Sequence, residues 1–425
     1  MVPQEWLKFA PPPRPLGPGE VWNVFLSYRS INRTWVLNLY DVLIELGHKV
    51  FLDQYVLKPG DVLVTKLNDA LEKSQAAVLI WSREAKDSEW VQEEYATLET
   101  KAKSNKSFFF VPVKIDSMQL PAFANNKIYI DFSSYPDGPN GGDLLRLLHG
   151  IVGQSLSPEA VRFANEQDEA AANNIAQIRA AIKNNQPKKI IALFSNGDLP
   201  FRSSPSLGCM AVEGLIKLKN NDDALLLLDK IIERFPKAIR PKQLKGLALA
   251  RRGNDDDIDK AQEILGVLQQ KNNLDPETMG IYARTWMDRY TKSNDINDLI
   301  QSRDLYAEAF DKSPDDYYTG INAAAKSIFI GTDYDIERGM MYASKVQALI
   351  GTEATPGDYW KTATVAEVFL IQKKYAEAAK MYATAIGYAR TEKGSIDSSR
   401  LQATRLLEKL KPGDVDKDLV LKVFR

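Results

Sequence analysis

The sequence predicts an α/β domain of the flavodoxin-like class, with a five-stranded parallel sheet, followed by an all-α solenoid of helix pairs. Three observations carry this prediction. Short apolar runs alternate with amphipathic helical patterns up to about residue 154, and the runs are apolar along both faces. Beyond about residue 155 the strand signals stop and helical patterns follow one another. We therefore expect a proline-rich leader at 1–20, the α/β domain at 21–154 and a helical domain at 155–425.

The apolar runs predict strands and the stretches between them predict helices. The predicted strands are 21–28, 49–53, 76–82, 107–115 and 127–132. Apolar residues recur at three- and four-residue intervals in 32–47, 61–74 and 87–103, which predicts a helix in each. Alternating strands and helices form right-handed crossovers and a parallel sheet. In the strand order 2-1-3-4-5, a ligand cleft is expected where the order reverses, between the first and third strands.

The second half of the chain has a repeat near 40 residues. Pro236, Pro276 and Pro314 each follow an amphipathic helical pattern, at separations of 40 and 38 residues (276−236 and 314−276). A helix pair per repeat is typical of an α-solenoid. Small residues on these patterns let paired helices approach closely, namely Ala224, Ala261, Ala307 and Ala378. The pattern resembles divergent tetratricopeptide repeats, whose usual period is about 34 residues.

The composition excludes several classes of function. The formal net charge is −1, so the chain has no overall basic field for nucleic acid or an anionic membrane. Cys209 is the only cysteine, and His48 and His149 are the only histidines. An internal disulfide and a cysteine-based metal cage are thereby excluded, and little remains for a zinc site or a Ser-His triad. No apolar run approaches the roughly 18 residues of a membrane span. We expect a cytoplasmic protein without a signal peptide. The proline-rich leader is expected to be a stiff linker, and the alternative is a proline-rich ligand for another protein.

Several chemistry-bearing residues are expected around the cleft at the carboxyl ends of the first three strands. The second strand feeds the 53–61 loop, which holds a Pro-Gly turn. The other expected cleft residues are Ser27, Tyr28, Arg29, Ser82, Arg83 and the start of the third helix with Trp90, Glu93 and Glu94. Neither GxxxxGK[ST] nor GxGxxG follows the first strand, and no GxSxG is present, which argues against phosphate-loop, dinucleotide-binding and α/β-hydrolase sites.

Three stretches in this order resemble the TIR (Toll/interleukin-1 receptor) domain. They are "VFLSYRS" (24–30), "KVFLDQYVLKPGD" (49–61) and "SREAKDSEWVQEEY" (82–95), which correspond to box 1, the BB loop and the αC region of that family. The resemblance covers about residues 21–153. In TIR domains that cleave NAD⁺, the catalytic glutamate lies four residues after a tryptophan. The resemblance therefore assigns that role to Glu94, four residues after Trp90, although many members have a cysteine where this chain has Val91.

A single carboxylate suits this chemistry. The nicotinamide of NAD⁺ is a cationic leaving group that departs neutral, so no general acid is needed, in contrast to ordinary glycosidases. A carboxylate beside the ribose stabilises the oxocarbenium-like transition state. Glu94 is expected in that place, and Glu93 in solvent, because adjacent helical residues point about 100° apart. NAD⁺ is the expected substrate, and no cofactor or metal is expected.

The other expected substrate-binding residues have alternative interpretations. Trp90 lies one helical turn before Glu94 and either stacks on a ring of the substrate or packs in the core. Ser27, Ser82 and Tyr28 would line the cleft. The cationic side chains of Arg29, Arg83 and Lys58 either pair with the pyrophosphate or are ordinary surface residues.

The helical half also has a resemblance, to the TRAF-binding region of stress-activated kinase kinase kinases. It is carried by 314–331, 359–386 and 394–410. This resemblance implies an interaction or oligomerising module, which would sense an unknown trigger and cluster the TIR domains through the BB loop, Asp53 to Asp61. The resulting hypothesis is an NAD⁺ glycohydrolase or cyclase, a prokaryotic antiviral immune effector. The alternative is a non-enzymatic TIR scaffold, which would need no Trp-x-x-x-Glu pattern.

Overall fold

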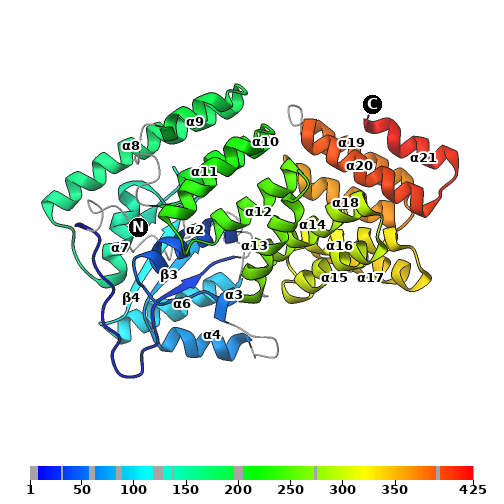
Figure 1. Ribbon diagram of the computed structural model, residues 1–425. Helices are drawn as coiled ribbons and strands as arrows, with labels where there is room; N and C mark the ends of the chain where they lie inside the picture. The colour runs from blue at the N-terminus through cyan, green and yellow to red at the C-terminus, as the bar shows by residue number, and fades with distance from the viewer. Residues whose placement is uncertain are drawn as a thin grey trace. The chain divides into compact units, whose positions relative to one another are not determined.

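The computed structural model describes two compact units, Met1–Asn272 and Asn273–Arg425 (Figure 1). Its described residues are 8–29, 32–56, 63–82, 89–117, 128–135, 138–195, 204–271, 275–388 and 393–424. The first unit contains a sheet and the helices that pack on it, and the second is built of helices. The compact unit thus ends near residue 272, far beyond the end of the predicted α/β domain at residue 154.

The five strands form one parallel sheet in the order β2-β1-β3-β4-β5, as predicted. The strands are β1 (Trp22–Ser27), β2 (Val50–Phe51), β3 (Ser74–Trp81), β4 (Phe109–Lys114) and β5 (Ile130–Asp131). β2 and β5 lie at the two edges and are shorter than the apolar runs that predicted them. The order reverses between β1 and β3, so the expected place for a ligand cleft exists.

Alternate residues of the strands enter two different cores. On β1, Val24 and Leu26 belong to one buried cluster, whereas Phe25 belongs to another. On β3, Val78 belongs to the first of these clusters and Leu79 to the second. Both faces of the sheet are therefore covered, which explains why the strands are apolar throughout.

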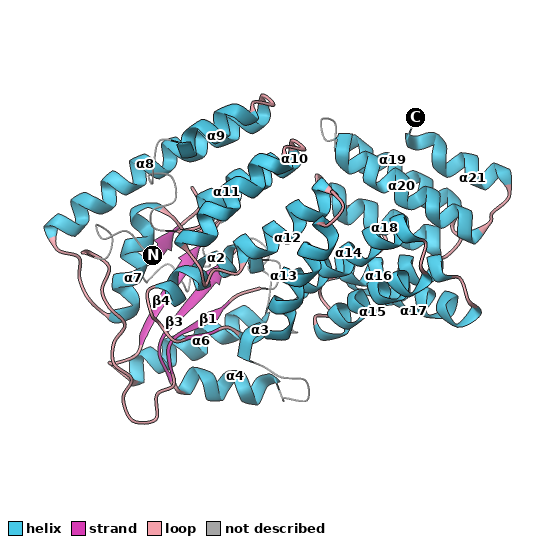
Figure 2. Cartoon of the chain, in the orientation of Figure 1, coloured by secondary structure: helices cyan, strands magenta, loops and turns pink. Residues whose placement is uncertain are grey.

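Helices form a layer on each face of the sheet (Figure 2). One layer contains α2 (Arg33–Glu45) and α7 (Gly141–Val152), and the other contains α4 (Leu63–Glu72) and α6 (Glu89–Ser104). A short helix, α3 (Asp53–Val56), follows β2. The sequence predicted no helix at the position of α7, directly after the fifth strand. Asn140 caps this helix by accepting a hydrogen bond from the backbone N–H of Gly141.

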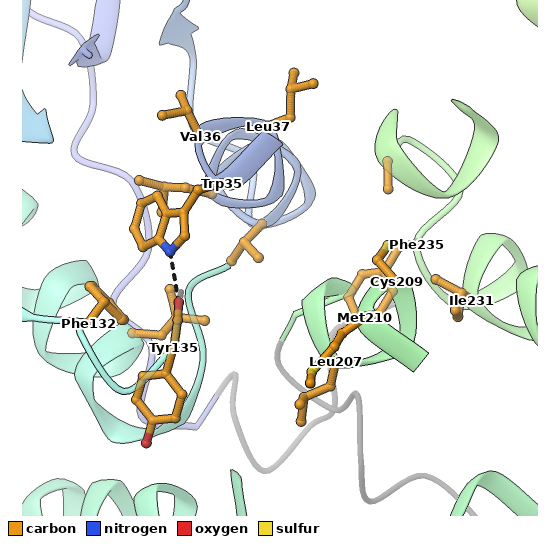
Figure 3. Close-up of a cluster of buried hydrophobic side chains, with 14 of the residues drawn as sticks. Trp35, Val36, Leu37, Phe132, Tyr135, Leu207, Cys209, Met210, Ile231 and Phe235 are labelled. Carbon is orange, nitrogen blue, oxygen red and sulfur yellow. Dashed lines mark hydrogen bonds between the residues drawn. The ribbon is translucent and has the colours of Figure 1, made fainter. Parts of the chain in front are cut away.

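The layer of α2 and α7 is covered in turn by the helices that follow it in the chain. These are α8 (Pro158–Lys183), α9 (Pro187–Ser195), α10 (Ser206–Lys217), α11 (Asn221–Arg234), α12 (Arg240–Arg252) and α13 (Asp257–Lys271). One continuous buried cluster runs from β1 and α2 into these helices. In Figure 3, Trp35 of α2 donates a 3.0 Å hydrogen bond to the Tyr135 carbonyl, and Cys209 of α10 lies among apolar side chains.

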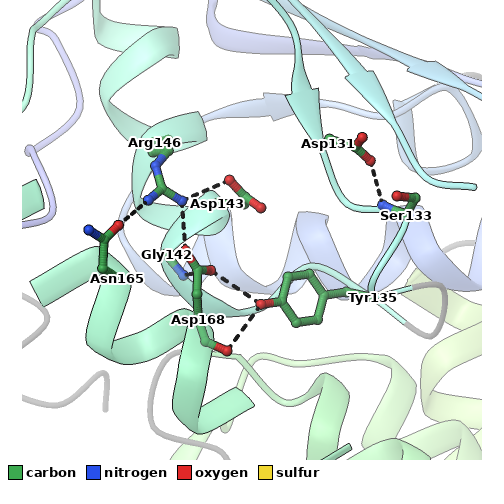
Figure 4. Close-up of polar contacts among 8 residues, drawn as sticks. All are labelled: Asp131, Ser133, Tyr135, Gly142, Asp143, Arg146, Asn165 and Asp168. Carbon is green, nitrogen blue, oxygen red and sulfur yellow. Dashed lines mark hydrogen bonds and ion pairs between the residues drawn. The ribbon is translucent and has the colours of Figure 1, made fainter. Parts of the chain in front are cut away.

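A polar network joins α8 to the start of α7 (Figure 4). The carboxylate of Asp168 accepts hydrogen bonds from the Gly142 N–H at 2.6 Å, from Arg146 at 2.8 Å and from the Tyr135 hydroxyl at 3.2 Å. An anionic group is favourable at a helix N-terminus, where the backbone N–H groups are otherwise unpaired. Asp168 thereby fixes α8 against the sheet domain.

A second polar contact joins α2 to α12. The buried Asp41 carboxylate accepts hydrogen bonds from the backbone N–H groups of Ile239 and Arg240, at 2.9 and 3.2 Å. Burial raises the pKa of Asp41 to about 7, although these hydrogen bonds and the nearby Lys242 act in the opposite direction. The Asp41 carboxylate therefore attaches the start of α12 to the sheet domain.

The described part of the leader is extended and is bonded to the sheet domain. Asn23 donates a hydrogen bond to the Arg14 carbonyl and Gln75 donates one to the Pro15 carbonyl, each at 2.8 Å. Nε2 of His149 lies 2.8 Å from the Phe9 carbonyl oxygen. Residues 8–20 thus form a strap bonded to the domain, where the sequence predicted a stiff linker.

The second unit is a stack of helices, so the predicted solenoid is confirmed. Its helices are α14 (Pro276–Ser293), α15 (Ile296–Lys312), α16 (Tyr317–Ile330), α17 (Asp333–Ile350), α18 (Tyr359–Ile371), α19 (Tyr375–Tyr388), α20 (Lys393–Leu410) and α21 (Asp414–Leu421). Neighbours from α14 to α19 pack consecutively, α20 packs on α16 and α18, and α21 packs on α19 and α20. The predicted spacer alanines are all buried, in both units. Pro276 begins α14 rather than only ending the preceding helix, as is usual for proline in a first turn.

The first prediction concerns the close approach of α7 and α8. A Cβ atom at Gly142 would lie 2.1 Å from the carbonyl oxygen of Ala164, a backbone atom that cannot move alone. We expect Gly142→Ala to lower the free energy of unfolding by about 1–3 kcal/mol, the usual cost of overpacking. Gly387→Ala in α19 is the control, since nothing lies within 4 Å of its Cβ position. Equal urea midpoints for Gly142→Ala and the wild type would contradict this packing.

The second prediction concerns the pH dependence of the contact between α2 and α12. An unfolded aspartate has a pKa near 4, below the value of about 7 for folded Asp41. The neutral carboxyl therefore contributes stability that is present below about pH 4 and is lost as the pH rises towards 7. Between pH 5 and 8, the free energy of unfolding of the wild type, measured with urea, should fall relative to that of Asp41→Asn at the same pH. A difference that stays constant across this range would show that Asp41 does not titrate there.

Candidate functional site at the carboxyl ends of the strands

Three hydrogen-bonded pairs join the carboxyl ends of β1, β2 and β3 to neighbouring elements. The Ser27 hydroxyl donates to Oε2 of Glu94 on α6. The Tyr28 hydroxyl donates to Asp53, at the start of α3, at 2.9 Å. The amide of Asn32 donates to the Ser82 hydroxyl at 2.7 Å. The predicted meeting of these segments at one edge of the sheet is thus present in the fold.

Glu94 lies near the start of α6 and is half-buried. Its helix is anchored by the next residue, Tyr95, which is 2% exposed and packs its ring near Trp81 and Phe110, at centroid distances of 6.2 and 5.3 Å. Glu93 is exposed, as predicted. The helix therefore directs Glu94 towards β1 and leaves the neighbouring glutamate in solvent.

A cavity of about 210 Å³ lies beside Glu94, between α4 and α6 and above β1. Its buried apolar walls are Phe25, Leu71 and Leu98. The remaining lining residues are Leu67, Asn68, Glu93, Glu94 and Thr97. The cavity combines apolar walls with a carboxylate and a side-chain amide, the composition expected of a site for a polar ring.

Not every residue predicted for the site can be placed. Ser27, Tyr28, Ser82 and Glu94 lie together at the carboxyl edge, and Arg29 follows Tyr28 there, half-buried. Arg83 and Lys58, with most of the 53–61 loop, lie outside the described residues, as does the side chain of Trp90, whose backbone belongs to α6. The substrate-binding roles of these residues remain predictions.

The sequence analysis missed the contribution of α4 to the cavity. Leu67, Asn68 and Leu71 come from that helix, and nothing in their spacing distinguishes them from an ordinary amphipathic face. Thr97 and Leu98 could have been found, because residues three and four positions after Glu94 share its side of a helix. Asn32, the partner of Ser82, carried no sequence signal.

The described residues do not form a metal site or an activated cysteine nucleophile. Within them, no cluster of three or more histidine, cysteine, aspartate or glutamate residues has a metal-binding arrangement. Cys209 is buried, and burial raises the pKa of its thiol, so the sulfur is not an activated nucleophile. None of the helices described has the length and apolarity needed to cross a bilayer.

Comparisons with known families divide the chain in two. Residues 24–147 match the TIR domain family (TIR_2), and residues 220–327 match the Tetratricopeptide Repeats-Sensor family (TPR-S). A probable 2′ cyclic ADP-D-ribose synthase of Brachypodium distachyon, BdTIR, is 32% identical over 112 residues, which are 26% of this chain. This chain spans 50% of the length of that relative.

Solved structures similar to this chain include a tetratricopeptide protein and a TIR domain. A tetratricopeptide protein of Thermus thermophilus is 15% identical with a TM-score of 0.37, covering 47% of this chain and 97% of its own. The TIR domain of the Toll-related receptor TRR-2 of Hydra magnipapillata is 22% identical with a TM-score of 0.23, covering 26% and 85%. From the family matches and the fold, the chain carries a TIR domain followed by a tetratricopeptide-like sensor region.

Proposed function

We propose that the TIR domain cleaves the bond between nicotinamide and ribose in NAD⁺, with Glu94 as its catalytic carboxylate. The observation that carries this proposal is the position of Glu94, which lines the cavity between α4 and α6 and accepts a hydrogen bond from Ser27 at the carboxyl end of β1. The name of BdTIR supports it, since cyclic ADP-ribose is the part of NAD⁺ that remains after nicotinamide has left.

The cavity suits one end of the dinucleotide. Ligand pockets usually measure about 300–1,000 Å³, so a cavity of about 210 Å³ holds a single ring and not the whole substrate. A nicotinamide ring would contact Phe25, Leu71 and Leu98, and the Asn68 amide at the mouth is of the right chemistry to pair with the carboxamide. The ribose then lies towards Glu94, and the adenosine part lies outside the cavity.

Glu94 acts by electrostatics. As the glycosidic bond lengthens, positive charge moves from the pyridinium ring to the anomeric carbon, and the carboxylate stabilises it there. Nicotinamide leaves as a neutral molecule, so the site needs no proton donor. Attack by water on the anomeric carbon would yield ADP-ribose, and attack by a hydroxyl of the same molecule would yield a cyclic isomer.

The helical region would regulate this activity. We propose that it responds to a trigger and brings TIR domains together, in a prokaryotic immune effector that depletes NAD⁺ or makes a cyclic signal. The match of residues 220–327 to a sensor family supports the first part. The same match supports the second candidate function, a scaffold that binds partners through its repeats without catalysis.

The third prediction tests the catalytic role of Glu94. Glu94→Gln keeps the size of the side chain and removes its charge, so NAD⁺ cleavage should fall by about 10²–10³-fold. Glu99→Gln is the matched control, since it removes a carboxylate from the same helix outside the lining of the cavity, and it should change the rate little. Nicotinamide release by the concentrated full-length chain is the measurement. Equal rates for Glu94→Gln and the wild type would refute the assignment, and no release by the wild type under any condition would favour the scaffold.

The fourth prediction tests clustering. If neighbouring TIR domains complete the site, NAD⁺ cleavage per subunit should rise with the concentration of the full-length chain. Size-exclusion chromatography with light scattering, at the same concentrations, reports the oligomer. A rate per subunit that does not change while the oligomeric state does would remove clustering from the proposal.

A further inference from the structure

Ser27 differs from the other residues at the site in its hydrogen-bond partner, which is Glu94 itself. It is the last residue of β1, is 3% exposed, and pairs in register with Leu79 of β3. It does not belong to the lining of the cavity. Its hydroxyl donates a hydrogen bond to Oε2 of Glu94, 67 residues further along the chain. The sequence analysis had placed Ser27 among the substrate-binding residues.

We propose that Ser27 is a positioning residue, which holds the Glu94 carboxylate ionised and fixes its direction relative to the cavity. This inference rests on the proposed function, in which Glu94 is the catalytic group. The donor is set on the most rigid element of the domain, the central sheet, whereas the acceptor is at the end of a longer side chain on a helix. The serine therefore orients the glutamate, and the reverse does not hold.

The hydrogen bond acts on both the charge and the geometry of Glu94. A hydroxyl donates to a carboxylate more strongly than to a neutral carboxyl group, so the contact favours the ionised form. The hydrogen bond also restricts rotation of the carboxylate, so that its other oxygen, Oε1, is held in a fixed orientation. An oriented charge stabilises the developing oxocarbenium ion without reorganisation during the reaction.

A second carboxylate lies beside Glu94. Among the described residues that line the cavity, Glu93 is the other titratable group, and it lies next to Glu94 on α6. α4 contributes Leu67, Asn68 and Leu71 to the cavity, none of which is charged. At the carboxyl edge lie Arg29 and the Tyr28–Asp53 pair. The carboxylate of Glu93 disfavours a second negative charge nearby, and the Ser27 hydroxyl opposes this effect.

The test compares Ser27→Ala with Ser27→Thr and a matched control. Ser27→Ala should lower kcat by about ten- to a hundredfold with little change in KM, because a hydrogen bond to a charged group is lost. The acid limb of its pH–rate profile should move to higher pH by about one unit. Ser27→Thr retains the hydroxyl and should recover most of the rate and the wild-type profile. Ser74→Ala, which removes another buried serine hydroxyl from the same sheet, should leave both unchanged.

A second measurement does not depend on activity. With glutamate labelled by ¹³C at the side-chain carboxyl carbon, the signal missing from Glu94→Gln identifies Glu94, and its titration can be followed in the wild type and in Ser27→Ala. The midpoint should lie at higher pH in Ser27→Ala. Identical midpoints would overturn the role of Ser27 even in an inactive protein. A shifted midpoint without NAD⁺ cleavage by the wild type would instead refute the proposed function alone.

Discussion

The requirement that both faces of the parallel sheet be buried determines the architecture of the first unit. Two helical layers meet this requirement, but the layer of α2 and α7 is itself strongly apolar on its outer side. Helices α8 to α12 cover it, and one buried cluster extends from β1 into them. The opposite layer, α4 and α6, has no such cover from within the described part of the unit, and it holds the cavity with Glu94. The face of the sheet under α2 and α7 is thus buried beneath further helices, and the face under α4 and α6 carries the cavity.

The candidate site depends on the rigidity of the sheet. Three hydrogen bonds hold the carboxyl ends of β1, β2 and β3 in place. Ser27 at the end of β1 bonds to α6, Tyr28 bonds to the start of α3 after β2, and Ser82 after β3 bonds to Asn32. The contact from Ser27 sets the position of Glu94 relative to the apolar walls of the cavity. A carboxylate on a loop would have more freedom and would stabilise a transition state less effectively.

The sequence predicted the strand order, the helices of both layers around the cleft and the solenoid, because these features depend on long periodic patterns. It did not predict α7, because the glycine-rich residues at the start of this helix are typical of a turn. Ser27 and Glu94 were both identified, but their mutual contact could not be, because it joins residues that only the packed fold brings together. The contribution of α4 to the cavity escaped for the same reason. The attachments of Asp41 and Asp168 to later helices involve single polar residues without any periodic signal.

The continuous core between the sheet and helices α8 to α12 has a consequence for how such chains can be rearranged. The matched TIR family ends at residue 147, yet the apolar surface that closes this domain comes from residues beyond it, such as Ala160, Ala164 and Leu207. Recombination at this family boundary would transfer a TIR domain with one face of its core exposed to water. The segment that can be exchanged intact between proteins therefore extends to about residue 272, and the first helices of the helical region travel with the TIR domain.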